Sequence, residues 1–122
     1  MFSMIARFGS PAIFFTLSPN DLFNFRILTM ASKDLGCEDP PGERDTSKDL
    51  KEFATRCAET RTACPSICAL DFEHIIEITI EHFLGWNKKK GVNISNKGLF
   101  GDLDGYTYAV EEQGRKTLHA HF

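Results

Sequence analysis

Two histidines near the end of the sequence have the spacing of a metal-ligand pair, in Leu118-His119-Ala120-His121. Side chains two residues apart in a β-strand point to the same face of the sheet, so the two imidazoles would project together. Imidazole nitrogens are good ligands for divalent transition metals. If residues 117–122 form a strand, that strand presents two metal ligands on one face.

An acidic residue is expected beside this pair. Residues 107–113 also have strand-forming composition, and the segment 114–116 between the two strands predicts a hairpin. A three-residue loop places Glu111 opposite His119, whereas a two-residue loop places Glu112 on that face instead. The motif alone is weak evidence, because a strand histidine is more often a hydrogen-bonded surface residue than a ligand. A carboxylate in either register strengthens it.

Three upstream segments have the patterns of elements that could position this hairpin. Residues 12–17 are apolar and β-prone and predict a buried strand. Ser18 and Pro19 then predict a helix start, because serine caps helices and proline suits their first position. Residues 47–60 predict a second helix whose apolar face includes Cys57.

The strongest helical pattern covers residues 65–84 and ends at Gly85, which suits a left-handed cap. The element order predicts an α+β fold in which helices pack on an antiparallel sheet. We expect one domain over residues 1–122, with a polar loop or insertion at about 32–49. Trp86 is expected to anchor the end of the long helix, with stacking on a nucleic-acid base as the alternative.

Composition restricts the classes of function. The net charge of −3 over 122 residues excludes a broadly basic nucleic-acid surface, so DNA contacts would depend on local lysines and arginines. The four cysteines do not have zinc-site spacing and are expected to be reduced thiols. Arg7 interrupts the apolar start, and no stretch reaches the roughly 18 residues of a membrane span. These features predict an intracellular protein without a signal peptide or membrane segment.

Several other reactive side chains have simpler interpretations. His74 and His82 share the polar side of the long helix with glutamates, which fits a solvated face better than a metal cluster. Tyr106 and Tyr108 are expected to pack rather than to act as nucleophiles. The lysines at 88–90 suit either phosphate contact or ordinary loop solvation.

The terminal block, residues 98–122, resembles the signature of the Helitron helicase-like amino-terminal (Rep) region of rolling-circle transposases. The similar segments are Phe100-Gly101, then Glu111-Glu112-Gln113-Gly114-Arg115, then Leu118-His119-Ala120-His121. Residues 9–18 resemble the opening strand of that family. Residues 64–86 resemble its central helix, although Cys64 stands where a capping asparagine is commoner.

The resemblance implies an HUH-type endonuclease that nicks and joins single-stranded DNA. In that superfamily two histidines and a third polar group hold Mg²⁺ or Mn²⁺ at the scissile phosphate, and a tyrosine attacks to form a phosphotyrosine link. Carried over here, the metal ligands are His119 and His121, with Glu111 as the third polar group. Arg115 and Lys116 are expected to contact DNA phosphates, and ordinary solvation of the loop is the open alternative. A functional transposase would be nuclear. No small-molecule cofactor is implied, and the sequence gives no oligomeric state.

One departure from the family pattern concerns the nucleophile. The family tyrosine lies downstream of the histidine pair, whereas Tyr106 and Tyr108 both lie upstream. We therefore expect a truncated Rep domain that binds metal, or single-stranded DNA weakly, without nicking. The alternative is a non-catalytic remnant or domesticated binding module. Other metal enzymes with this motif need further ligands downstream of the pair and are discounted.

Overall fold

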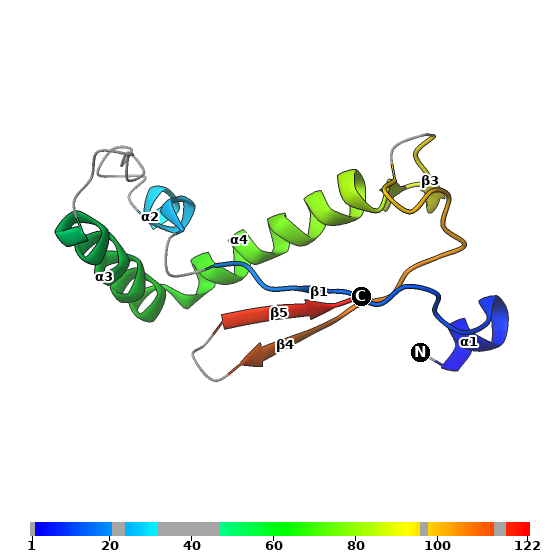
Figure 1. The fold of residues 1–122 in the computed structure, drawn as a ribbon, viewed down its shortest axis with the longest axis horizontal. Coiled ribbons are helices and arrows are strands. Elements are labelled where there is room, and N and C mark those ends of the chain that lie inside the picture. The colour runs from blue at the N-terminus through cyan, green and yellow to red at the C-terminus, as the bar shows by residue number, and fades with distance from the viewer. Residues whose placement is uncertain (1, 21–23, 32–46, 96–97, 114–116) are drawn as a thin grey trace. The chain divides into compact units, whose positions relative to one another are not determined.

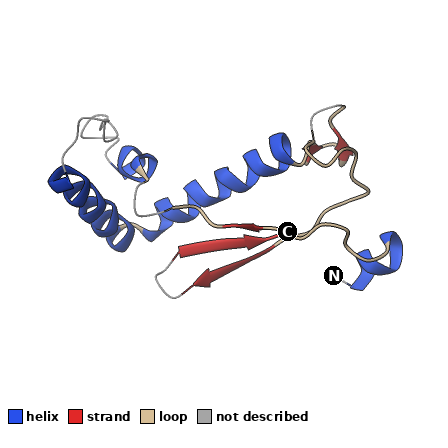
Figure 2. Ribbon diagram, viewed as in Figure 1, coloured by secondary structure: helices blue, strands red, loops and turns tan. Residues whose placement is uncertain are grey.

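The computed structural model describes residues 2–20, 24–31, 47–95, 98–113 and 117–122 (Figure 1). The chain forms two compact units, one of residues 1–18 with 74–122 and the other of residues 19–73. Helices and small antiparallel sheets make up the described residues, which confirms the predicted α+β class (Figure 2). None of the described helices combines the length and apolarity that crossing a membrane requires.

A three-stranded antiparallel sheet is the centre of the first unit. Its strands are β1 (Thr16–Leu17), β4 (Ala109–Gln113) and β5 (Thr117–His121), in the order β1-β5-β4. The predicted hairpin is confirmed, and Gln113 pairs with Thr117, so residues 114–116 connect the strands. The predicted 12–17 strand is shorter than expected. Only Thr16 and Leu17 form it, paired with His121 and Ala120. The expected burial is wrong, because Phe15 and Leu17 are half-buried and the other residues of 12–17 are exposed.

The long helix has the predicted extent but changes its geometry near its end. Helix α4 (Pro65–Ile78) continues into a π-helical turn, η2 (Thr79–Phe83), in which the Leu84 amide donates to the Thr79 carbonyl at 2.9 Å. The Thr79 hydroxyl donates to the Ile75 carbonyl at 2.8 Å, a side-chain bond that competes with regular helical pairing. Gly85 follows with a φ of 68° and ends the helix, as the sequence predicts.

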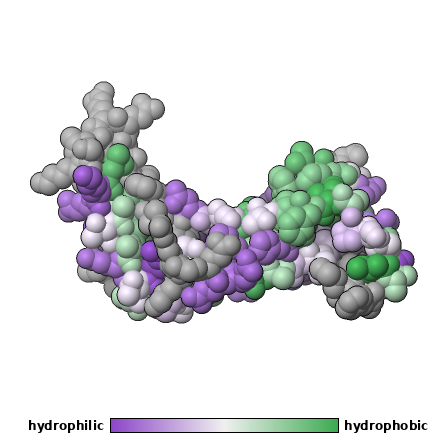
Figure 3. Space-filling view, turned by 60° about the horizontal axis from the view of Figure 1, so that its bottom comes forward, coloured by the Kyte–Doolittle hydropathy of each residue, from purple (hydrophilic) through white to green (hydrophobic). Residues whose placement is uncertain are grey.

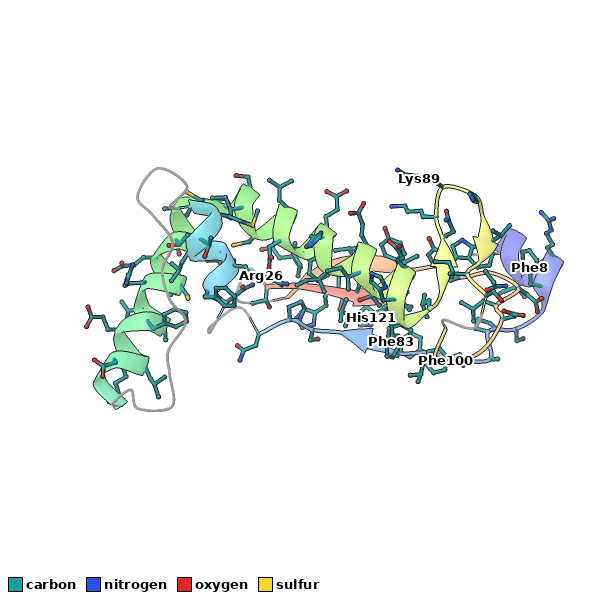
Figure 4. All side chains as sticks on the ribbon, turned by 90° about the horizontal axis from the view of Figure 1, so that it is seen from above. Phe8, Arg26, Phe83, Lys89, Phe100 and His121 are labelled. Atoms are coloured by element: carbon teal, nitrogen blue, oxygen red, sulfur yellow. The ribbon has the colours of Figure 1, made fainter. Side chains whose placement is uncertain are left out.

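An aromatic cluster attaches the end of this helix to the sheet. Phe15 stacks on Phe122 at 4.7 Å and contacts Phe83 at 5.5 Å, measured between ring centroids. Phe100 meets Phe83 edge-on at 5.5 Å, and Tyr108 stacks on Phe122 at 5.1 Å. Figure 4 shows Phe83 and Phe100 side by side. These rings lie in contact on the apolar face of the sheet, and Ala120 on that face is fully buried.

Three elements of the first unit were not predicted from the sequence. Helix α1 (Phe2–Phe8) lies at the N-terminus, and β2 (Trp86–Asn87) pairs with β3 (Val92–Asn93) after the long helix. Gly98 then approaches the helix end so closely that a Cβ there would lie 2.6 Å from the Leu84 carbonyl oxygen. Only glycine fits this position. The Leu99 amide donates a hydrogen bond of 2.9 Å to the Phe83 carbonyl and holds the chain there.

The second unit contains α2 (Phe25–Ala31), α3 (Ser47–Ala63) and the first part of α4. Leu28, Phe53 and Cys57 form its buried apolar cluster, which confirms the core role expected of Cys57. The Asp71 carboxylate, 4% exposed, accepts a bond of 2.7 Å from Asn24 and pairs with Arg26 at 3.0 Å. Cys57 and Cys64 have free thiols. Cys37 lies outside the described residues.

Two predictions about this unit need correction or restriction. The helix expected to begin at Ser18 begins instead at Phe25, where the Asn24 side chain accepts a bond from the Arg26 amide at 3.1 Å. Asn24 therefore supplies the cap, as asparagine commonly does. Of the predicted insertion at 32–49, residues 32–46 lie outside the described residues, and the rest begins α3.

Burial differs sharply between two isoleucines near the helix end. Ile80 is 1% exposed and Ile78 is 41% exposed. Ile80→Ala is expected to lower the free energy of unfolding by about 2–5 kcal/mol, because it leaves a cavity. Ile78→Ala, the matched control, is expected to cost about 1 kcal/mol or less. Urea unfolding measures both, and equal losses would contradict the packing described here.

Burial raises the pKa of the Tyr106 phenol above its usual value, and the neighbouring Tyr108 adds to the rise. A raised folded-state pKa stabilises the protein fully below the unfolded value of about 10, and this stabilisation is lost as pH rises through the folded pKa. In Tyr106→Phe, the free energy of unfolding should therefore fall less steeply above about pH 10. Urea unfolding across that range tests this, and parallel curves for both proteins would refute it.

Candidate metal-binding face of the sheet

The two histidines lie on one face of the central strand, as the sequence predicts. We call this the histidine face: Thr117, His119 and His121 from β5, Glu111 from β4 and Thr16 from β1. Their common side follows from register, since Glu111 pairs with His119 and Thr16 pairs with His121. The intervening residue, Ala120, is buried on the opposite side.

The register also decides between the two carboxylates. Glu112 pairs with Leu118, so it belongs to the other face, and the two-residue loop is wrong. Glu111 is the acidic residue of the histidine face. Its direct partner across the strands is His119, but its Oε1 atom lies 2.8 Å from Nε2 of the diagonal neighbour, His121. The carboxylate is therefore already in contact with one imidazole.

Hydroxyl groups occupy the other ring nitrogens. The Thr16 Oγ1 atom lies 3.1 Å from Nδ1 of His121, and the Ser18 Oγ atom lies 2.6 Å from Nδ1 of His119. The Nε2 atom of His119 is 3.3 Å from Oγ1 of Thr117. Both rings thus have Nδ1 toward the first strand segment, while Nε2 meets Glu111 or Thr117.

An aromatic ring borders the histidine face. Phe14 lies parallel to the His121 imidazole, at an interplanar angle of 9° and a centroid separation of 6.0 Å. Its side chain is 73% exposed, which is unusual for a phenylalanine. Apolar side chains reach the surface elsewhere as well (Figure 3). Leu99 of this unit, for example, is 67% exposed.

The donor set fits a divalent cation in type. Two imidazoles and one carboxylate suit Mn²⁺, and Mg²⁺ would depend more on the carboxylate oxygen. In the part of the chain that the structure describes, no three His, Cys, Asp or Glu side chains are arranged closely enough to hold a metal ion. The histidine nitrogens instead make the hydrogen bonds given above. Coordination would require Glu111 and the two Nε2 atoms to turn toward a common point.

The remaining residues singled out from the sequence lie elsewhere. His74 and His82 are exposed on the helix, as expected. Arg115 and Lys116 lie outside the described residues, so their expected DNA contacts remain predictions. Lysines 88–90 are exposed in the turn between β2 and β3, and Figure 4 shows Lys89 away from His121.

The two tyrosines pack, as the sequence predicts. Tyr106 stacks on Tyr108 at a centroid separation of 6.4 Å and meets Trp86 edge-on at 5.9 Å. Trp86 therefore anchors the residues after the helix end to the segment that leads into β4. Burial and the neighbouring ring raise the pKa of Tyr106, which disfavours the phenolate that a nucleophile needs.

Three residues of the site were missed in the sequence: Phe14, Thr16 and Ser18. The alternation of a strand was the available signal, because positions 14, 16 and 18 share one face if the strand extends through them. Ser18 was interpreted as a helix cap, a role that the serine–proline pair suggests locally. Only the long-range register with β5 shows that its hydroxyl meets His119.

Comparison with protein-family models identifies the family of the chain. A family model described as the Helitron helicase-like domain at the N-terminus matches residues 1–122. No curated protein and no solved structure matches the chain significantly. The family match spans the strand, the central helix and the terminal hairpin that carries the histidine pair. The chain therefore belongs to the family of Helitron helicase-like N-terminal domains.

Proposed function

We propose that the histidine face binds a divalent metal ion, Mn²⁺ or Mg²⁺, and presents it to single-stranded DNA. The domain would contribute this site to nicking and joining in rolling-circle transposition. The observation that supports the proposal is that two imidazoles and a carboxylate share one face of the sheet, with Glu111 2.8 Å from His121. The reaction class is carried over from the resemblance to the Rep region of rolling-circle transposases.

In this proposal His119, His121 and Glu111 hold the ion. A bound metal would polarise the phosphoryl oxygens and stabilise the charge that develops on them. The histidines are well suited to this role because β5 is paired with a strand on each side. Sites on such supported elements are held more precisely than sites on loops.

Phe14 is the residue that we assign to the DNA strand. Its ring is 73% exposed beside His121. Nucleic-acid bases stack on exposed aromatic rings with little sequence preference. A base on Phe14 would lie beside the histidine face, and its phosphate could then reach the metal. Arg115 and Lys116 would add charge for the backbone.

We propose further that residues 1–122 do not form a covalent link to DNA. Both tyrosines in the sequence lie upstream of the histidines and pack against other rings. The raised pKa of Tyr106 adds to this argument. The same observation favours the second candidate function, a metal- and DNA-binding module without catalysis.

Removal of a proposed ligand should weaken metal binding. His119→Ala and His121→Ala are each expected to reduce Mn²⁺ affinity by at least about 10-fold, measured by isothermal titration calorimetry. His82→Ala is the matched control, because that imidazole is exposed on the helix and should leave affinity unchanged. Absence of Mn²⁺ binding by the unaltered chain, or an equal loss in His82→Ala, would rule out the site.

Removal of the exposed ring should weaken DNA binding. Phe14→Ala is expected to cost about 1–3 kcal/mol of affinity for labelled single-stranded DNA, measured by fluorescence anisotropy at fixed salt. Phe8→Ala is the control, because Phe8 is 43% exposed and Figure 4 shows it away from His121. Equal effects of the two substitutions would remove Phe14 from the site.

Covalent chemistry is assayed in the same samples. With Mn²⁺ present, we expect no denaturation-resistant protein–DNA adduct from residues 1–122. An adduct that forms with the unaltered chain and disappears in His119→Ala would show that these residues are catalytically competent on their own.

A further inference from the structure

The first strand segment carries two hydroxyls at the spacing of the two histidines. Thr16 pairs with His121 and Leu17 with Ala120, so the same antiparallel register brings Ser18 opposite His119. Each hydroxyl contacts Nδ1 of the histidine that it faces, at 3.1 Å for Thr16 and 2.6 Å for Ser18. One register therefore produces two hydroxyl–imidazole contacts of the same kind.

A neutral imidazole can offer a metal either ring nitrogen. One nitrogen carries the proton and the other carries the lone pair, and the hydrogen bonds around the ring decide which is which. Metal-bound histidines usually have their second nitrogen bonded to a neighbouring group, which fixes the ring. In this site Nδ1 of each ring has a hydroxyl partner on the first strand segment. The Nε2 atoms contact Glu111 at 2.8 Å and Thr117 at 3.3 Å, and a metal ion at Nε2 would replace these two contacts.

We propose that Thr16 and Ser18 are positioning residues that occupy Nδ1 of both histidines and so reserve Nε2 for a metal ion. The metal part of this inference rests on the proposed function. The hydroxyls do not touch the ion or the DNA in this scheme. They act through the imidazoles, by holding each ring with Nδ1 at the hydroxyl and Nε2 on the opposite side of the ring.

A hydroxyl suits this role better than a carboxylate or an amine. It can donate or accept, so it keeps its bond to Nδ1 whichever nitrogen carries the proton. The Glu111 Oε1 atom lies 2.8 Å from Nε2 of His121, and the Thr16 hydroxyl lies 3.1 Å from Nδ1. With a metal ion held at Nε2, Nδ1 would carry the ring proton and the Thr16 hydroxyl would accept from it.

The test measures the ¹⁵N chemical shifts of the histidine side chains by NMR in the ¹⁵N-labelled 122-residue chain. Spectra are recorded without metal and with Zn²⁺, which serves as a diamagnetic probe. We expect Zn²⁺ on Nε2 of both histidines, with Nδ1 protonated. Thr16→Val should disturb this pattern at His121 alone, and Ser18→Ala should disturb it at His119 alone. Each should lower Mn²⁺ affinity by about 10–100-fold.

Conservative variants and a distant control separate positioning from general stability. Thr16→Ser and Ser18→Thr keep the hydroxyl and should retain both the spectra and the affinity. Thr55→Val, whose hydroxyl bonds only the Lys51 carbonyl among the contacts described, should do the same. Unchanged spectra and affinity in Thr16→Val and Ser18→Ala would overturn the inference.

Metal binding by the unaltered chain tests the proposed function separately from the positioning role of the hydroxyls. If the unaltered chain binds neither Mn²⁺ nor Zn²⁺, the metal proposal fails, and the metal-free spectra then decide the role of the hydroxyls. A shift in the nitrogen signals of His119 in Ser18→Ala, and of His121 in Thr16→Val, would support the positioning role. Signals that stay in place would end it.

Discussion

The antiparallel pairing of β5 with a strand on each side is the constraint on which the site depends. Because side chains alternate across a strand, one register puts both histidines, Glu111 and Thr16 on one face and Ala120 on the other. A slip of one residue would exchange the faces and bury the imidazoles against the aromatic cluster. The cluster prevents this, because Phe122 stacks on Phe15 and Tyr108 only in the observed register.

The elements with strong local signals were predictable from the sequence. The hairpin, the helix from residue 65 to its glycine end, and the core position of Cys57 all follow from periodicity and turn composition. The start of α2 did not follow, because Ser18 and Pro19 have the local pattern of a helix start. Tertiary context overrode that pattern when Ser18 paired beside His119. The π-turn at Thr79 has no periodic signature that would distinguish it from an α-helix.

The site was predictable only in part, for the same physical reason. The two histidines are neighbours on one strand, so their common face can be read from spacing alone. The position of Glu111 depended on the length of the hairpin loop, and the sequence allowed a loop of either two or three residues. Phe14, Thr16 and Ser18 required knowledge of which strand pairs with β5. That pairing is long-range, and no local pattern encodes it.

The hydroxyl–imidazole contacts join nearly opposite ends of the sequence. Thr16 and His121 are 105 positions apart, and Ser18 and His119 are 101 apart. Each contact closes a loop of almost the whole chain, and pairings of such high contact order form slowly. During synthesis the first strand must wait, without its partner, until the last residues of the hairpin have left the ribosome. The histidine face is thus assembled late, after helix-forming segments between its two halves have had time to fold.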